Sequence, residues 1–220
     1  MGHNIAIDGP AGAGKSTVAR KVAGRLGYIY VDTGAMYRAM ALFLSRKGIG
    51  AEETEKIDKA CEEADITIRY ENGEQIVLLN GENVNGLIRT EAVSRMASGS
   101  SANPNVRARL VRLQQALAAK ENVVMDGRDI GTCVLPEAEV KVYLTASVEI
   151  RARRRFDELA AKGGTGSLEE IAADIRERDH KDMTREISPL CQADDAVLID
   201  TSHMGIDEAV EAVIALCARD

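Results

Sequence analysis

Short apolar runs alternate along this chain with longer segments in which apolar residues recur at helical spacing. The apolar runs predict strands at Asn4–Asp8, Tyr28–Asp32, Val123–Asp126, Val140–Leu144 and Val197–Asp200. The longer segments are rich in Ala, Leu, Glu, Lys and Arg, and they predict helices at Thr17–Leu26, Ala35–Arg46, Asn105–Lys120, Val148–Lys162, Leu168–His180 and Ile206–Cys217. Because strands and helices alternate, we expect an α/β fold with a parallel sheet that helices cover on both faces.

One segment near the middle of the chain has a different pattern. Apolar and polar residues alternate over 66–70, and the pairs Asn72-Gly73 and Asn80-Gly81 flank the apolar run 76–79. Asn-Gly pairs are typical of tight hairpin turns, so we expect an antiparallel meander over about residues 66–85. Such a meander does not belong to a parallel core. It is therefore interpreted as an insertion that is flanked by helices, with boundaries near Ala60 and Glu91.

Composition narrows the class of protein. The chain has 220 residues, of which 45% are hydrophobic, and this suits one α/β domain with insertions. The net charge of −7 argues against nucleic acid as a partner. No apolar run approaches membrane length, and the first residues lack the pattern of a signal peptide, so we expect no membrane association and a cytoplasmic location. The cysteines and histidines are scattered, which makes a zinc site or a disulfide framework improbable; they are Cys61, Cys133, Cys191, Cys217, His3, His180 and His203.

The strongest chemical signal is the phosphate-loop motif that follows the first predicted strand. Its residues are Gly9, Pro10, Ala11, Gly12, Ala13, Gly14, Lys15 and Ser16, with Thr17 opening the next helix. Glycines let backbone N–H groups surround phosphate oxygens, and the helix N-terminus adds partial positive charge. Lys15 can reach the β- and γ-phosphates, and Ser16 can reach Mg²⁺. We therefore expect a nucleoside triphosphate site; a chance glycine turn would leave the Lys-Ser pair and the flanking elements unexplained.

Several predicted strands end in an aspartate. Ligands of open α/β sheets bind beyond the carboxyl ends of the strands, so we expect Asp8, Asp32 and Asp126 near the phosphate loop. Asp126 could hold Mg²⁺ directly or through water, while Arg128 faces phosphate and Asp129 accepts hydrogen bonds. A surface turn is the competing interpretation of residues 126–129. Thr33 is either the N-cap of the helix that follows or a contact to the acceptor phosphate.

Two sets of charged residues lie on predicted helices late in the chain. Arg151, Arg154 and Arg155 share one helix face, and the glycine-rich stretch 163–167 follows their helix. This combination favours a mobile lid whose arginines stabilise the charge of a transferring phosphoryl group, although a solvated helix face would also explain the spacing. The second set is Arg178, Asp182 and Arg185, which intrahelical pairing alone could explain.

Four blocks together resemble the bacterial cytidylate kinase family, whose members move the γ-phosphoryl group of ATP to CMP or dCMP. The blocks run from Asp8 to Thr17, from Asp32 to Arg38, from Asp126 to Thr132 and from Glu177 to Arg185, and with the meander they span nearly the whole chain. The resemblance implies one phosphate-loop kinase domain over residues 1–220. It implies a five-stranded parallel core, an antiparallel nucleoside-monophosphate-binding insertion over about 36–105, and a short lid over about 150–167. It also implies a monomer that uses ATP and Mg²⁺.

The resemblance further implies a role for individual side chains. Ser98, Arg107 and Asp129 would face the cytosine base. Thr33, Arg38, Arg128 and Arg185 would surround the acceptor phosphate, and Arg178 and Asp182 would lie toward the ribose and its phosphate. Thr33 stands where relatives often have Ser, which keeps the hydroxyl but adds a methyl group that restricts χ1.

Two other functions fit parts of the sequence. A kinase acting on another nucleoside monophosphate or a small metabolite would share the core, the loop and the lid, but the meander and the implied set Ser98, Arg107 and Asp129 disfavour it. A regulatory GTP-binding switch would share the phosphate loop. However, the chain contains neither an Asn-Lys-x-Asp motif nor an Asp-x-x-Gly motif.

Overall fold

The computed structural model describes residues 3–71, 73–161 and 163–218. By their contacts these residues form two compact units, which we call unit 1 and unit 2. Unit 1 comprises Ile29–Glu121, and unit 2 comprises His3–Tyr28 and the chain from Asn122 onward. The larger sheet has five strands in the order β2-β6-β1-β7-β8, and a separate sheet has the order β3-β4-β5. This confirms the predicted α/β class, the five-stranded parallel sheet and the separate antiparallel sheet.

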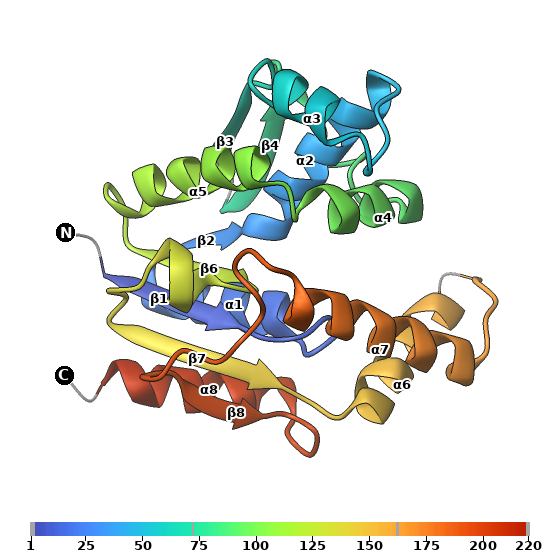
Figure 1. Cartoon of the computed structure of the whole chain (residues 1–220). Helices are drawn as coiled ribbons and strands as arrows, with labels where there is room; N and C mark the ends of the chain where they lie inside the picture. Colours follow the sequence, from blue (N-terminus) through green and yellow to red (C-terminus); the bar gives the residue numbers. More distant parts are fainter. Residues whose placement is uncertain (1–2, 72, 162, 219–220) are drawn as a thin grey trace. The chain divides into compact units, whose positions relative to one another are not determined.

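Unit 2 is built on parallel strands with helices between them (Figure 1). Strand β1 pairs in parallel with β6 and with β7, and β7 pairs in parallel with β8. The strands are β1 (Asn4–Asp8), β6 (Val123–Gly127), β7 (Val140–Thr145) and β8 (Val197–Asp200), and the helices are α1 (Lys15–Leu26), α6 (Val148–Ala161), α7 (Leu168–Thr184) and α8 (Ile206–Cys217). Because Asp8 is in register with Gly127, the ends of β1 and β6 place their polar residues side by side.

Local sequence signals explain where the helices of unit 2 begin and end. Helix α1 ends at Gly27, which has a φ of 70° and donates its N–H to the carbonyl of Ala23. Helix α7 begins with a capping box between Ser167 and Glu170. Helices α6 and α7 pack through a small apolar cluster that contains Ala152, Ile171, Ala172 and Ile175. The predicted end of α6 at Lys162 lies outside the described residues.

A short π-helical turn, η1 (Ile130–Val134), follows β6 in unit 2. The periodicity of the sequence does not predict it. The Asp8 carboxylate accepts hydrogen bonds from the N–H groups of Ile130 and Gly131, at 2.8 and 2.7 Å. The turn is therefore held by a residue more than a hundred positions earlier in the chain.

Unit 1 combines helices with the antiparallel sheet. Its elements are β2 (Ile29–Asp32), α2 (Thr33–Arg46), α3 (Thr54–Cys61), β3 (Ile66–Glu71), β4 (Glu74–Leu79), β5 (Glu82–Asn83), α4 (Glu91–Ser100) and α5 (Pro104–Ala118). Strand β3 pairs antiparallel with β4, and β4 with β5. Asn80 and Gly81 both have positive φ, 50° and 81°, as the predicted Asn-Gly turn requires. Asn72, in the other predicted turn, lies outside the described residues.

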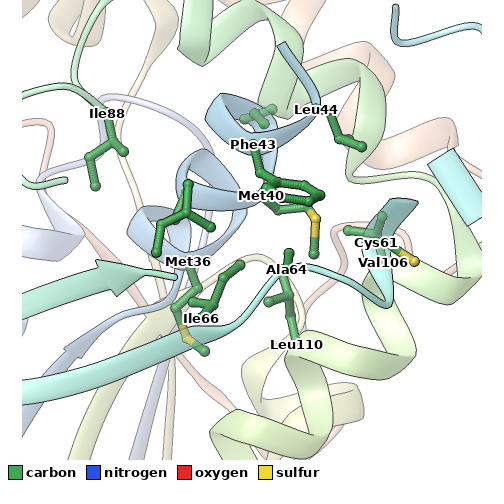
Figure 2. Packing of buried hydrophobic residues seen from close by; sticks show 14 of the residues in the cluster. Met36, Met40, Phe43, Leu44, Cys61, Ala64, Ile66, Ile88, Val106 and Leu110 are labelled. Carbon is green, nitrogen blue, oxygen red and sulfur yellow. The ribbon is translucent and has the colours of Figure 1, made fainter. Parts of the chain in front are cut away.

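An apolar cluster forms the core of unit 1. Figure 2 shows Met36, Met40 and Leu44 of α2 in one cluster with Ile66 of β3 and with Val106 and Leu110 of α5. Met36 and Met40 are at most 1% exposed. Most residues of this core lie on helices, above all on α2, while β3 and β4 contribute Ile66, Val77 and Leu79. Helices α3 and α4 also add to it, and no residue range was predicted for either.

Candidate functional site

The phosphate loop of unit 2 connects the end of β1 to the start of α1. A Cβ atom at Gly9 would lie 2.0 Å from the carbonyl oxygen of Leu144, so only glycine fits at this close approach to β7. Gly14 has a φ of 91° and forms the N-cap of α1. Its carbonyl accepts from the N–H groups of Thr17 and Val18, at 3.1 and 3.0 Å. The first-turn N–H groups of α1 thus adjoin the loop, as in anion sites at helix N-termini.

Lys15 lies in the loop with 5% of its surface exposed. Its ammonium group donates to the carbonyl of Pro10 at 2.8 Å. Burial, together with the nearby positive charge of Arg128, lowers the pKa of Lys15 to about 7, although Asp126 and Asp8 act in the opposite direction. A negatively charged ligand in the loop would favour the protonated ammonium form.

Ser16 and Asp126 meet at the junction of α1 and β6. The Ser16 hydroxyl donates to Oδ2 of Asp126 at 2.9 Å, and Asp126 is buried. A hydroxyl and a carboxylate are hard oxygen ligands of the kind that Mg²⁺ uses together with water and substrate phosphates. Among the described residues, no three His, Cys, Asp or Glu side chains converge on a possible metal site. The pair therefore fits an ion that is shared with a substrate.

Asp8 is buried and bonded to main-chain N–H groups, whereas a carboxylate at the open edge of a sheet is expected to face a ligand. It is 5% exposed and points into the N-terminus of η1. Burial raises the pKa of Asp8 to about 6, against the opposing effect of the two backbone hydrogen bonds. Asp8 thereby anchors the segment that follows Arg128 and Asp129.

Four predicted site residues come together in unit 2 beyond the end of β6. Arg128 donates through Nε to Oδ2 of Asp182 at 2.7 Å, and both side chains are mostly buried. Nη2 of Arg185 lies 3.7 Å from Oδ1 of Asp129, and both residues are again nearly buried. Arg185 also donates through Nε to the carbonyl of Ser188 at 2.6 Å. Asp182 thus pairs with an arginine of another element, whereas the sequence suggested pairing within its own helix.

Arg178 belongs to helix α7 and lies one turn before Asp182. The sequence analysis groups Arg178 with Asp182 and Arg185, because the three follow one another at helical spacing. The C-cap of α7 at Arg185, with extended backbone, turns the chain away after these residues.

The three arginines of α6 have unlike surroundings. Arg151 is 4% exposed and donates to the carbonyls of Ala146 and Ala11, at 2.8 and 3.0 Å. Arg154 donates to the hydroxyl and the carbonyl of Thr201, at 3.2 and 2.8 Å. Arg155 is exposed and pairs with Glu158 at 3.3 Å. The shared helix face therefore does not give the three side chains a shared environment.

In unit 1, Asp32 forms the N-cap of α2 and accepts from the N–H of Ala35 at 2.8 Å. The interpretation of Thr33 as the N-cap is therefore wrong, because Thr33 already has helical geometry and the longer reach of Asp32 satisfies the cap. Asp32 also accepts from Arg38 at 2.9 Å and from Arg89 at 3.4 Å. Gly34 leaves room for this pairing, since a Cβ there would lie 3.1 Å from Nη1 of Arg38.

Ser98 and Arg107 also belong to unit 1, on α4 and α5, whereas Asp129 belongs to unit 2. Arg107 is 4% exposed and its guanidinium lies over the ring of Tyr37, with Cζ 5.7 Å from the centroid. It also donates to the carbonyl of Ser101 at 3.3 Å. Ser98 is partly buried, and its carbonyl accepts from the Ser101 hydroxyl at 3.0 Å.

Sequence reasoning did not single out Arg89, Tyr37, Asp179 or Thr201. Each contacts a predicted site residue within its own unit. Tyr37 and Asp179 lie within two of the recognised blocks, so membership of a block was an available signal for them, whereas Arg89 lies outside all four. Thr201 carried no signal of its own.

Other kinds of site find little support in the structure. Within residues 3–71, 73–161 and 163–218, no helix is both long and apolar enough to cross a membrane. The cysteines Cys61, Cys133, Cys191 and Cys217 are free thiols.

Comparison with known proteins identifies the family. A family model described as cytidylate kinase matches residues 5–219. The cytidylate kinase of Carboxydothermus hydrogenoformans is 51% identical over 215 residues, covering 98% of this chain and 97% of that protein. The cytidylate kinase of Caldicellulosiruptor saccharolyticus is 50% identical over 213 residues, covering 97% and 94%. An uncharacterised protein from Eubacterium ventriosum shares the fold, with a TM-score of 0.55, 13% identity and full coverage of both chains. Nearly the whole length of the chain aligns with these relatives at about 50% identity, and the chain belongs to the cytidylate kinase family.

Proposed function

We propose that this protein transfers the γ-phosphoryl group of ATP to CMP and dCMP, giving ADP and CDP or dCDP. The observation that carries the proposal is family membership over nearly the whole chain, joined to a phosphate loop with a buried lysine. An oxygen of the CMP phosphate attacks the γ-phosphorus, and the bond from that phosphorus to the bridging oxygen of ADP breaks. The attacking oxygen carries no proton above about pH 6, so the reaction requires positioning and charge stabilisation rather than a general base.

The donor is held by unit 2 in this proposal. Residues 9–17 surround the triphosphate, and Lys15 supports the β- and γ-phosphates as negative charge shifts toward ADP. Ser16 and Asp126 would hold Mg²⁺, which supplies charge neutralisation between the phosphates when it is bound. Arg155 remains exposed on α6, within the proposed lid at about 150–167, and can turn toward the transferred group.

A second set of residues is proposed for the acceptor. Thr33, Arg38, Arg128 and Arg185 bind its phosphate, while Arg178 and Asp182 lie toward the ribose. Ser98, Arg107 and Asp129 read the cytosine. A carboxylate such as Asp129 accepts a hydrogen bond from the exocyclic amine of cytosine, whereas uracil presents a carbonyl oxygen at the same place.

We further propose that residues 1–220 work as a single kinase domain with an acceptor-binding region at about 36–105. The protein would act as a monomer in the cytoplasm on small-molecule nucleotides. Its net charge of −7 supports the expectation that nucleic acid is not a partner.

The test is a product assay with ATP and equal concentrations of CMP, dCMP, UMP, AMP and GMP, with and without Mg²⁺. We expect CDP and dCDP as the main products and little activity without the ion. Equal turnover of AMP or UMP would indicate a kinase of another nucleoside monophosphate. ATP binding without transfer to any of the five acceptors would favour a metabolite kinase.

A further inference from the structure

Arg151 joins three segments of unit 2 that are far apart in the sequence. Its guanidinium donates to Ala11 of the phosphate loop and to Ala146 before α6, at 3.0 and 2.8 Å. Nη1 also lies 2.7 Å from Oδ2 of Asp179 on α7, and the two side chains are 5% and 11% exposed. A guanidinium that already serves three acceptors is not poised to leave them for a substrate, because a buried charge that loses its partners is costly.

The contact with Ala11 bears directly on the geometry of the phosphate loop. In a planar trans peptide the C=O of one residue and the N–H of the next point in opposite directions. Because the Ala11 carbonyl points toward Arg151, the N–H of Gly12 points away from it. This N–H is one of the loop donors that would surround a phosphate.

Gly12 itself packs against the same arginine. A Cβ atom at Gly12 would lie 3.3 Å from Cβ of Arg151. The arginine therefore meets the loop through its aliphatic part as well as through its guanidinium. Asp179 holds the other side of the guanidinium, and the apolar cluster with Ala152 and Ile175 holds α6 and α7 together.

We propose that Arg151, anchored by Asp179, is a positioning residue that orients the phosphate loop for its nucleotide, rather than a lid arginine that meets the transferred phosphoryl group. The proposal refines the donor site of the proposed kinase. It predicts that the Arg151–Asp179 pair contributes to the binding of any nucleoside diphosphate or nucleoside triphosphate in the phosphate loop. A lid arginine would act only when a γ-phosphoryl group is being transferred.

The experiment compares Asp179→Asn with Arg176→Gln. Both variants remove one ion pair between α6 and α7, but the pair of Arg176 with Glu149 is exposed and has no contact with the loop. ADP, which lacks the γ-phosphoryl group, is titrated calorimetrically with Mg²⁺ present and no acceptor. We expect Asp179→Asn to weaken ADP binding roughly 10-fold and to raise KM for ATP by a similar factor. KM for CMP should change less than about twofold. Arg176→Gln should bind ADP like the wild type.

Three results would overturn the proposal. ADP binding could be unchanged in Asp179→Asn while kcat falls, which is the behaviour of a lid contact. ADP binding and kinetics could both be unchanged while the melting temperature drops, which is the behaviour of a purely structural pair. Arg176→Gln could weaken ADP binding as much as Asp179→Asn, which would make the effect a general loosening of the two helices.

Arg151→Lys is the second variant, for the case in which Asp179→Asn does not fold. Lysine keeps the charge but lacks the planar fork that reaches several acceptors at once. It should weaken ADP binding in a protein whose circular dichroism is unchanged, and unaltered ADP affinity would again contradict the proposal. If the wild type binds ADP but phosphorylates no nucleoside monophosphate, the proposed function fails while this inference can still be tested.

Discussion

Buried charges surround the candidate donor site in unit 2, whereas apolar packing surrounds the candidate acceptor residues in unit 1. Asp8, Lys15 and Asp126 are each at most 6% exposed, and main-chain groups or polar side chains contact them. Arg38 and Arg107 instead belong to α2 and α5, two helices that contribute side chains to the apolar cluster of Figure 2. Charges that leave water must be compensated by their neighbours, so in unit 2 the charges position one another. In unit 1 the helices carry the candidate residues on an apolar core, and the ion pair of Arg38 with Asp32 is added to that support.

The largest effect should follow from removing the central charge of unit 2. Lys15→Ala should lower kcat by roughly 10²- to 10³-fold, because a preorganised positive charge at the developing negative charge is lost. Stability should not fall, since burial already disfavours the Lys15 ammonium. Turnover and far-UV circular dichroism are measured together. The control is Lys21→Ala, an exposed lysine on the same helix. A folded Lys15→Ala protein with normal turnover would contradict the donor site.

The next effect concerns recognition of the cytosine base by the buried carboxylate of Asp129. Asp129→Ala should lower kcat/KM for CMP by roughly 10- to 10³-fold and that for UMP far less, because an unpaired buried polar group costs about 1–3 kcal/mol. The preference for CMP over UMP should narrow accordingly. Glu186→Ala removes a nearby exposed carboxylate and should leave the preference unchanged. Full preference in Asp129→Ala would exclude this residue from reading the base.

A third effect appears in the dependence of stability on pH. Burial raises the pKa of Asp8 from 3.8 to about 6, so its contribution to the free energy of unfolding is complete below about pH 4 and is lost as the pH rises through 6. Asp8→Asn has no such titration. Relative to the wild type it should therefore gain up to roughly 3 kcal/mol between pH 4 and pH 7, from about two units at about 1.4 kcal/mol each.

Urea unfolding of the wild type and Asp8→Asn across this pH range measures the difference. Asp194→Asn serves as the control, because Asp194 is an exposed residue of unit 2. A constant difference between Asp8→Asn and the wild type would show that Asp8 titrates as it does in the unfolded chain.

The smallest effect tests the packing of unit 1. Tyr37→Leu removes the ring beneath Arg107 and should raise KM for CMP roughly 2- to 10-fold, in line with the loss of one cation–π contact. KM for ATP should stay the same. Tyr37→Phe keeps the ring and should behave like the wild type. An increase in both KM values would mean that the substitution disturbs more than the orientation of Arg107.

Sequence reasoning reached the elements whose signals are local. Strand β1 and helix α8 have the predicted bounds, because buried runs and helical spacing are properties of neighbouring residues. Helices α3 and α4 escaped prediction because they are short and bury few side chains. The turn η1 escaped because its anchor, Asp8, lies in β1.

The candidate site also has one part that local sequence signals predict and one part that they do not. The phosphate loop was readable because one short segment carries its chemistry. The partners of its side chains were not readable, since Arg128 meets Asp182 and Arg151 meets Asp179 only through the packing of separate elements. Spacing along one helix suggested that Arg151, Arg154 and Arg155 act alike. Their neighbours make Arg151 buried and Arg155 exposed.

Asp32 starts a helix and holds two arginines with the same carboxylate. Its Oδ1 caps α2, and its Oδ2 accepts from Arg38 and Arg89. Few side chains can meet both demands, since Asn keeps the cap but loses the charge, and Glu keeps the charge but reaches too far for the cap. In a library of random variants, we therefore expect tolerated substitutions at position 32 to be rarer than at Ser45, an exposed residue of the same helix, and we expect expression level and acceptor affinity to decline together at position 32.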